Sequence, residues 1–277
     1  MILKKIEIKN FKSIKEIDNL KLTTLNVLIG SNGAGKSNFI SFFKMLNMMI
    51  QERLQDYIKE QNGADNILHF GLKYSDEISA KIDFENNSYR FILKPTQGDS
   101  LYFSEEATPY VGENIIGRSN YETQLFNTKG SKLRGSGYKG VSDYVIEAMQ
   151  SWRVYHFHDT SSTAKVKGIS TISSSVNKQL LANAENLSAF LYYLKLKFPD
   201  SFFMIEETVK LIAPYFDKFI LEPDIFDEDK IRLEWLEIGN EKVFNAHHLS
   251  DGTLRMICLT TLLLQPNAPD TIIIDEP

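Results

Sequence analysis

One stretch near the N-terminus restricts the fold of this chain more than any other: Gly30-Ser31-Asn32-Gly33-Ala34-Gly35-Lys36-Ser37. It fits the pattern G-x-x-x-x-G-K-[ST], which requires a strand in front and a helix behind. Apolar residues at 25–29 predict a buried parallel strand, and apolar residues recur at helical spacing from Phe39 to Ile50. The stretch therefore predicts a phosphate-binding loop in an α/β fold.

Each residue type in this loop suits the binding of a triphosphate. Glycines let successive backbone N–H groups turn inward around the phosphates. Lys36 can reach the β- and γ-phosphates and take part in catalysis, while the Ser37 hydroxyl can ligate Mg²⁺. We expect ATP to contact the whole loop: Gly30, Ser31, Asn32, Gly33, Ala34, Gly35, Lys36, Ser37 and Asn38. The alternatives are a glycine-rich turn that carries Lys-Ser by chance, and a dinucleotide fingerprint, which would need glycine where Asn38 stands.

Composition excludes some classes of protein. The chain has 277 residues, of which 43% are hydrophobic and 24% charged, as in soluble globular proteins. The single cysteine, Cys258, excludes an intramolecular disulfide and is expected to be a small core residue rather than a nucleophile. Neither a signal peptide nor a membrane span is apparent, so we expect a soluble cytoplasmic protein.

The formal net charge of -5 gives no global attraction to nucleic acid. Any DNA contact must come from local basic clusters, and the alternative for these lysines and arginines is a solvated loop. The candidates are Lys129, Lys132, Arg134, Lys139, Lys165 and Lys167.

Hydrophobic periodicity organises the rest of the chain. We expect an edge strand over 1–11, a strand over 21–29 and a helix from the loop to Leu54, followed by a β-hairpin of 78–84 and 89–93. Helices are expected over 141–152, 187–194, 202–212 and 252–264, a small antiparallel sheet from 219–221, 231–238 and 242–244, and a central strand over 271–274 with a neighbour on each side. The expected domains are a nucleotide-binding lobe (1–150), an inserted lobe (151–248) and a closing helix and strand (249–277).

Two further motifs lie in the last segment. The apolar run Ile272-Ile273-Ile274 ends in Asp275 and Glu276, where Asp275 can hold Mg²⁺ and Glu276 can polarise an attacking water. The alternative is an acidic turn. Upstream, Ser250 and Gly252 open an apolar helix and can form an anion site, although capping by Ser250 or Asp251 explains the same residues.

The order of these motifs resembles the ABC-type ATPase heads, a P-loop NTPase fold with a mixed sheet, an antiparallel β part and an inserted helical lobe. The opening Asn10-Phe11-Lys12-Ser13 is similar to that of the SMC/RecF/OLD branch, and Ser250-Asp251-Gly252-Thr253-Leu254-Arg255 with the final Asp-Glu-Pro resembles a stand-alone bacterial AAA-family ATPase subgroup. The resemblance implies an ATP-sandwiched homodimer in which Ser250 and Gly252 act on the partner's γ-phosphate. Asp251 departs from the second glycine found in transporters.

The resemblance implies Mg²⁺-dependent ATP binding and hydrolysis coupled to head dimerisation, in DNA repair or anti-phage defence, with DNA and a nuclease or other effector as partners. The alternative is an ATP-gated regulatory subunit with little turnover; a transporter motor is disfavoured by the opening motif. ABC heads continue past the Asp-Glu pair, so we expect this chain, apparently truncated after that pair, to bind ATP but hydrolyse it poorly.

Three smaller features stay open. His156, His158 and Asp159 could form a metal trio, but the sequence offers no further cluster with ligand spacing, and a structural role is favoured. His247 and His248 are expected to be solvated or to support the signature. The glutamine that senses Mg²⁺ in ABC heads cannot be assigned.

Overall fold

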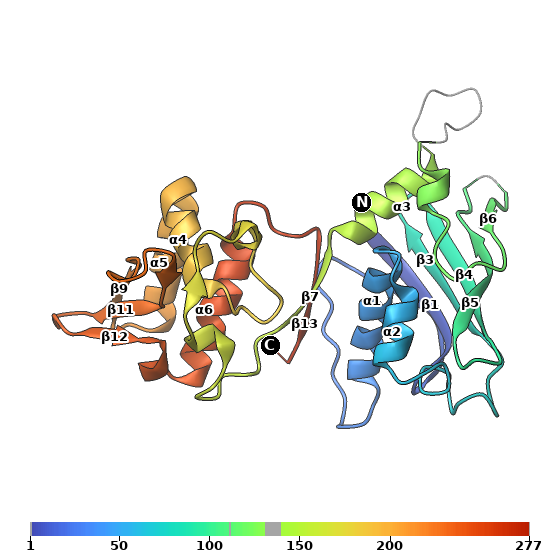
Figure 1. Cartoon of the computed structure of the whole chain (residues 1–277), viewed down its shortest axis with the longest axis horizontal. Coiled ribbons are helices and arrows are strands. Elements are labelled where there is room, and N and C mark those ends of the chain that lie inside the picture. Colours follow the sequence, from blue (N-terminus) through green and yellow to red (C-terminus); the bar gives the residue numbers. More distant parts are fainter. Residues whose placement is uncertain (1, 111, 131–139, 277) are drawn as a thin grey trace. The chain divides into compact units, whose positions relative to one another are not determined.

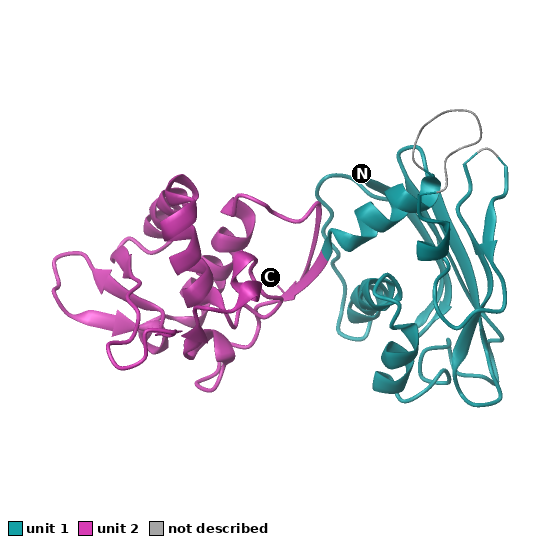
Figure 2. Cartoon of the chain, turned by 45° about the horizontal axis from the view of Figure 1, so that its top comes forward, with its two compact units in different colours: residues 1–152 teal, residues 153–277 magenta. Residues whose placement is uncertain are grey.

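A computed structural model describes residues 2–110, 112–130 and 140–276. These residues form two compact units, Met1–Trp152 and Arg153–Pro277, each with its own core (Figure 2). The predicted basic residues Lys132, Arg134 and Lys139 lie outside the described residues. The first unit contains the phosphate-loop sequence, and the second contains the segments 250–252 and 275–276.

The first unit is built on a six-stranded antiparallel sheet with the order β2-β1-β3-β4-β5-β6 (Figure 1). Its strands are β1 (Leu3–Phe11), β2 (Ile14–Lys21), β3 (Ile78–Phe84), β4 (Ser88–Pro95), β5 (Leu101–Ala107) and β6 (Ile115–Gly117). The predicted hairpin is confirmed, because β3 pairs with β4 through Ile82↔Tyr89 and Ala80↔Phe91. Alternate residues of β3 are buried, as expected for a sheet with one covered face.

Helices cover one face of this sheet (Figure 1). They are α1 (Lys36–Met49), α2 (Leu54–Glu60) and α3 (Val141–Gln150), with a short 3₁₀ turn η1 (Phe126–Thr128). Phe42 of α1 meets Phe11 of β1 edge-on, with ring centroids 5.5 Å apart. Phe43 contacts Trp152 in the same manner at 5.5 Å. Edge-to-face packing of fully buried rings fixes α1 on the sheet.

Three expectations for this unit are corrected. Strand β1 is not an edge strand, since β2 and β3 flank it. The edge strand is β2, which the sequence did not predict because most of its side chains are exposed and show little apolar alternation. The first helix ends at Met49 rather than Leu54, and the backbone turns there, with Glu52 at a φ of 55°.

The largest departure is the segment 25–29, which forms no strand and is not buried. Leu25 is 79% and Ile29 92% exposed. Local hydrogen bonds replace strand pairing, because the Thr23 N–H donates to Asn26 Oδ1 at 2.9 Å and Asn26 Nδ2 donates to the Thr23 carbonyl at 2.8 Å. A buried parallel strand needs neighbours on both sides, and the antiparallel sheet of this unit ends at β2. The prediction of a buried strand here is wrong.

The second unit contains the helices α4 (Leu187–Lys197), α5 (Pro199–Ile212) and α6 (Asp251–Leu264). Its first strand, β7 (Trp152–His156), begins at the last residue of the first unit. The other strands are β8 (Ser170–Thr171), β9 (Phe216–Ile220), β10 (Lys230–Ile231), β11 (Glu234–Glu237), β12 (Val243–Asn245) and β13 (Thr271–Asp275). The 3₁₀ turns are η2 (Lys165–Lys167), η3 (Ser175–Lys178) and η4 (Ala246–His248). The predicted small antiparallel sheet is confirmed with the order β12-β11-β9.

The core of the second unit is centred on α6. Leu254, Ile257 and Leu262 are buried, and they belong to one apolar cluster with α4 and α5 residues such as Leu191 and Ile205. Strand β13 pairs with β7 in a two-stranded sheet, and its residues are only half-buried. Within the described residues β13 has one neighbouring strand, so the expectation of a central strand with two neighbours is wrong. The β-branched residues of this run correctly predict a strand. The number of strands that pair with it depends on the rest of the sheet, which the run itself does not reveal.

The exposure of residues 25–29 leads to a stability prediction. Ile29→Ala should change the free energy of unfolding by less than about 0.5 kcal/mol, as at other exposed sites. Phe42→Ala, the buried control on α1, should cost about 3–5 kcal/mol. Urea denaturation of both variants measures the difference. A loss of about 2 kcal/mol or more for Ile29→Ala would show that this segment is buried after all.

Candidate functional site

The phosphate-loop sequence forms a turn that leads directly into α1. Gly33 and Gly35 have φ values of 83° and 92°, a region that favours glycine. Gly35 is the N-cap of α1, and having no side chain it makes no cap hydrogen bond to the first turn. The N–H groups and the positive end of the helix dipole are therefore available to an anion.

Lys36 lies over this loop. Its ammonium donates to the carbonyl of Gly30 at 2.6 Å and to that of Ser31 at 2.9 Å. These carbonyls hold the ammonium within the loop, and a bound phosphate can replace them as its hydrogen-bond acceptors. Ser37 is exposed in the first turn of α1, as a hydroxyl that ligates a metal requires.

The N-terminal motif 10–13 packs against the start of α1. Asn38 Nδ2 donates to the Ser13 hydroxyl at 2.7 Å, and a Cβ on Gly35 would lie 3.0 Å from the same oxygen. Lys12 Nζ donates to Ser41 Oγ at 2.8 Å and to Gln61 Oε1 at 2.7 Å. Partial burial, followed by the nearby Lys44 charge, lowers the pKa of Lys12. Sequence reasoning used this motif only for the resemblance and missed that Ser13 adjoins the loop.

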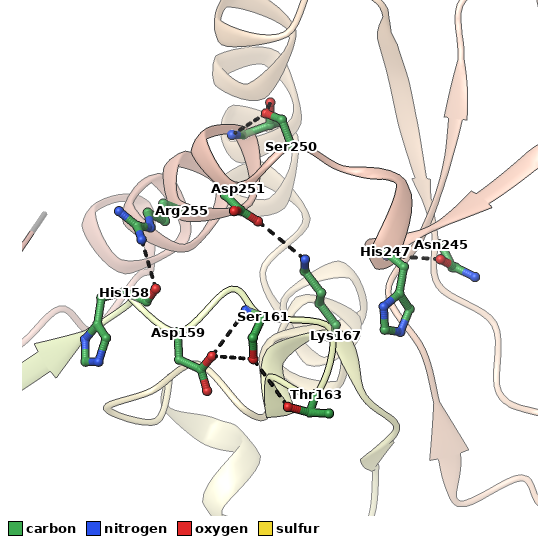
Figure 3. Close-up of polar contacts among 11 residues, drawn as sticks. His158, Asp159, Ser161, Thr163, Lys167, Asn245, His247, Ser250, Asp251 and Arg255 are labelled. Atoms are coloured by element: carbon green, nitrogen blue, oxygen red, sulfur yellow. Dashed lines mark hydrogen bonds and ion pairs between the residues drawn. The ribbon is translucent and has the colours of Figure 1, made fainter.

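The segment 250–252 begins α6. Ser250 is the N-cap, and its hydroxyl accepts from the Thr253 N–H at 3.1 Å, so the capping role is confirmed. Apart from its chain neighbours and the nearby backbone of α6, no described heavy atom lies within 4 Å of the position that a Cβ on Gly252 would take. Asp251 Oδ1 lies 3.5 Å from Lys167 Nζ, whose side chain is 7% exposed (Figure 3). The first turn of α6 is thus capped, anchored on one side and open at Gly252.

Arg255 provides a second anchor for this helix start. Its Nη2 donates to the carbonyl of His158 at 2.9 Å, which ties α6 to the loop after β7 (Figure 3). That loop is itself ordered by Asp159, whose Oδ1 accepts from the Ser161 hydroxyl at 2.8 Å. Hydrogen bonds from Ser161 lower the pKa of Asp159.

The two predicted carboxylates follow one another at the end of β13. Asp275 is the last residue of the strand, and Glu276 is exposed with a φ of 51°. The predicted site residues therefore divide between the units, with residues 30–38 in the first and Ser250, Gly252, Asp275 and Glu276 in the second.

Two of the remaining basic candidates, Lys165 and Lys167, form local ion pairs. Lys165 Nζ lies 3.0 Å from Glu185 Oε2, and Lys167 is paired with Asp251. The rings of His156 and His158 are 6.3 Å apart. Within the described residues, no three His, Cys, Asp or Glu side chains are grouped so that they could hold a metal ion. The His247 N–H donates to the capping oxygen of Asn245 at 3.0 Å (Figure 3).

One buried carboxylate was not singled out from the sequence. Glu106 of β5 is fully buried, and it accepts from the Tyr89 hydroxyl at 2.6 Å, from the Thr123 hydroxyl, and from the Gln124 N–H at 2.7 Å. Burial raises the pKa of Glu106. Two of its donors, Thr123 and Gln124, tie the segment after β6 to the sheet, which is a structural role that no local sequence pattern indicates.

Comparison with known proteins identifies the family. Residues 25–277 match the family described as "AAA domain, putative AbiEii toxin, Type IV TA system". The match covers most of the chain and includes the phosphate loop and both later motifs, so the chain belongs to this family of AAA-type P-loop ATPases. No curated protein matches the chain. In the part of the chain that the structure describes, every helix is too short or too polar to cross a bilayer.

The placement of Cys258 can be tested chemically. It lies buried on α6, and burial raises the pKa of its thiol to about 12. We expect the folded protein to react with a thiol reagent at pH 8 far more slowly than the urea-unfolded protein, because the thiolate is the reactive form. Cys258→Ser gives the background. Equal rates in the two states would contradict the core placement.

Proposed function

We propose that this chain binds ATP with Mg²⁺ at residues 30–38 and hydrolyses it. The observation that carries the proposal is the start of α1, where a glycine at positive φ takes the cap position and Lys36 lies over the loop carbonyls. Such a helix start lacks a side-chain acceptor and offers N–H groups and an ammonium to the same anion. A polyphosphate matches that donor set.

The Mg²⁺ that accompanies ATP needs hard oxygen ligands. Ser37 is an exposed hydroxyl and Asp275 a carboxylate at the end of β13, and the resemblance to ABC-type heads implies that these two residues hold the metal. The metal would neutralise phosphate charge, while the exposed carboxylate of Glu276 would accept a proton from the attacking water. The same arrangement of roles is implied by the resemblance to ABC-type heads of the SMC/RecF/OLD branch.

We further propose that hydrolysis is coupled to pairing of two copies of the chain. The open position beside Gly252 and the exposed Ser250 support this proposal, because a second anion can approach the N-terminus of α6 there. In the ABC-type heads that the chain resembles, this turn contacts the γ-phosphate held by the partner.

The family description, which names a toxin and a Type IV TA system, supports a role in defence or in a toxin–antitoxin system over one in DNA repair. An effector such as a nuclease would then respond to the ATP state. The hydrolysis rate is measured for the chain by itself, with duplex DNA and with a candidate partner. Stimulation by DNA would favour the repair role, and stimulation by the partner would favour the defence role. Partner stimulation of a slow single turnover would favour a regulatory subunit.

Lys36→Ala tests the nucleotide site. Loss of a charge-assisted contact to phosphate, worth about 1.5–3 kcal/mol, should weaken ATP binding in calorimetry by about 10-fold to 150-fold. Lys44→Ala removes an exposed lysine from the same helix and should leave the affinity unchanged. Circular dichroism checks that both variants fold. ATP binding by Lys36→Ala as tight as that of the control would disprove the assignment of the loop.

Ser250→Arg tests the pairing. Both Ser250→Ala and Ser250→Arg lose the α6 cap, at a cost of about 0.5–2 kcal/mol in stability, but only arginine fills the space at the helix start. In a Glu276→Gln background that slows hydrolysis, we expect Ser250→Ala to form ATP-dependent dimers in analytical ultracentrifugation and Ser250→Arg to remain monomeric. Dimerisation of both variants would exclude this surface from the interface.

A further inference from the structure

A cavity of about 500 Å³ opens beside the phosphate loop in the first unit. It is lined by residues 12–13, by Asn38 of α1 and by the turn around residues 65–71. Its volume lies in the range of small-molecule pockets. Neither the phosphate-loop pattern nor the family description assigns a role to the turn at 65–71.

The cavity adjoins the place where phosphates are proposed to bind. Two of its lining residues, Asn38 and Ser13, are joined by a hydrogen bond of 2.7 Å, and Ser13 Oγ lies 3.0 Å from the Cβ position of Gly35. A ligand anchored by its phosphates at the start of α1 can therefore extend into this cavity without leaving the protein surface.

Phe70 presents a flat apolar ring at the cavity. Its side chain is 76% exposed, and the residue has a φ of 57°, which is unusual for a bulky side chain. One side of the ring contacts His69, with centroids 4.1 Å apart. His69 is buried, and its Nδ1 is hydrogen-bonded to the Lys12 carbonyl at 2.7 Å. The Tyr74 ring also meets Phe70 in a T-shaped contact, with centroids 6.2 Å apart. The ring is thus held by two aromatic neighbours, while its high exposure leaves area for stacking with a ligand.

The turn that carries Phe70 is held by Asp65. Asp65 Oδ1 accepts from the Leu72 N–H at 2.7 Å, and the Asp65 N–H donates to Asp99 Oδ1 at 3.0 Å. Gly71 has a φ of 80°, and a Cβ there would lie 2.5 Å from Asp65 Oδ1. This close packing fixes the direction in which Phe70 projects.

The charges in the cavity favour an uncharged ligand group over a phosphate. The Lys12 ammonium is already bonded to Ser41 and Gln61. The Asp65 carboxylate adds a negative charge that repels phosphate, while the Ser13 hydroxyl and the amides of Asn38 and Asn66 provide polar edges. A planar ring with hydrogen-bonding edges and a hydroxylated sugar fits this combination.

We propose that the cavity binds the nucleoside end of the nucleotide, with the base stacked on Phe70. The proposal rests on the proposed function, in which residues 30–38 hold the phosphates. Phe70 is then a substrate-binding residue that selects a nucleotide over a bare polyphosphate. Asp65 is a positioning residue for that ring.

Two ligands and two substitutions test the proposal. ATP and inorganic tripolyphosphate, each with Mg²⁺, are titrated into the full chain by calorimetry. Phe70→Leu should weaken ATP binding about 10-fold, in line with the loss of one base–aromatic stack, and should leave tripolyphosphate binding unchanged. Phe70→Tyr keeps the ring and should keep the ATP affinity. Tyr110→Leu, at an exposed aromatic residue outside the cavity, is the matched control.

The outcomes separate this proposal from the proposed function. Unchanged ATP affinity in Phe70→Leu, or an equal loss for ATP and tripolyphosphate, would overturn the base-stacking role. An equal loss in Phe70→Leu and Phe70→Tyr would also overturn it, because the ring is present in one of them. If Lys36→Ala weakens the binding of neither ATP nor tripolyphosphate, the proposed phosphate site at residues 30–38 is refuted. The role of Phe70 is still decided by the comparison of Phe70→Leu with Phe70→Tyr.

Discussion

The edge-to-face contact of Phe42 with Phe11 is the packing on which the candidate site depends. It holds α1 against the antiparallel sheet, and the direction of α1 decides where its first N–H groups point. The motif at 10–13 follows from the same contact, because Phe11 and Ser13 are two residues apart on a chain that turns at Lys12. One side chain is buried beneath α1 while the other reaches the helix start. The core and the ligand site of the first unit are therefore parts of one arrangement.

The two glycine-containing helix starts differ in chemistry. At α1 the cap is Gly35, which leaves the first turn without a side-chain acceptor. At α6 the hydroxyl of Ser250 already accepts one N–H, and Asp251 adds a negative charge beside it. An anion is therefore bound more favourably at α1, where the cap residue has no side chain to accept from the first N–H groups. This difference is consistent with a primary phosphate site in the first unit and a weaker contact at α6.

The sequence predicted those elements whose burial is decided by local periodicity. The hairpin of β3 and β4 and the helices α3 to α6 carry apolar residues at the spacing of their own covered faces, so their patterns are self-contained. The sequence-based prediction was wrong for segments whose structure depends on pairing with other strands. Residues 25–29 and β13 are apolar on both faces, and such runs become central strands only when two neighbours are present. The candidate site shows the same division: the loop 30–37 is recognised from adjacent residues, whereas Ser13 reaches it only through a tertiary contact. Nothing in the sequence around His69 and Phe70 announces an exposed ring at positive φ.

The exposed segment 25–29 has a consequence for the protein in solution. It is an uncharged, β-prone stretch that is exposed and belongs to no strand, which is the kind of surface to which a second chain can add a strand. Electrostatic repulsion opposes such encounters, and the formal charge of -5 at pH 7 supplies some of it. That repulsion vanishes near the isoelectric point of about 5.6. Association through this segment is therefore expected to increase as the pH falls toward 5.6, and purification above neutral pH at low protein concentration opposes it.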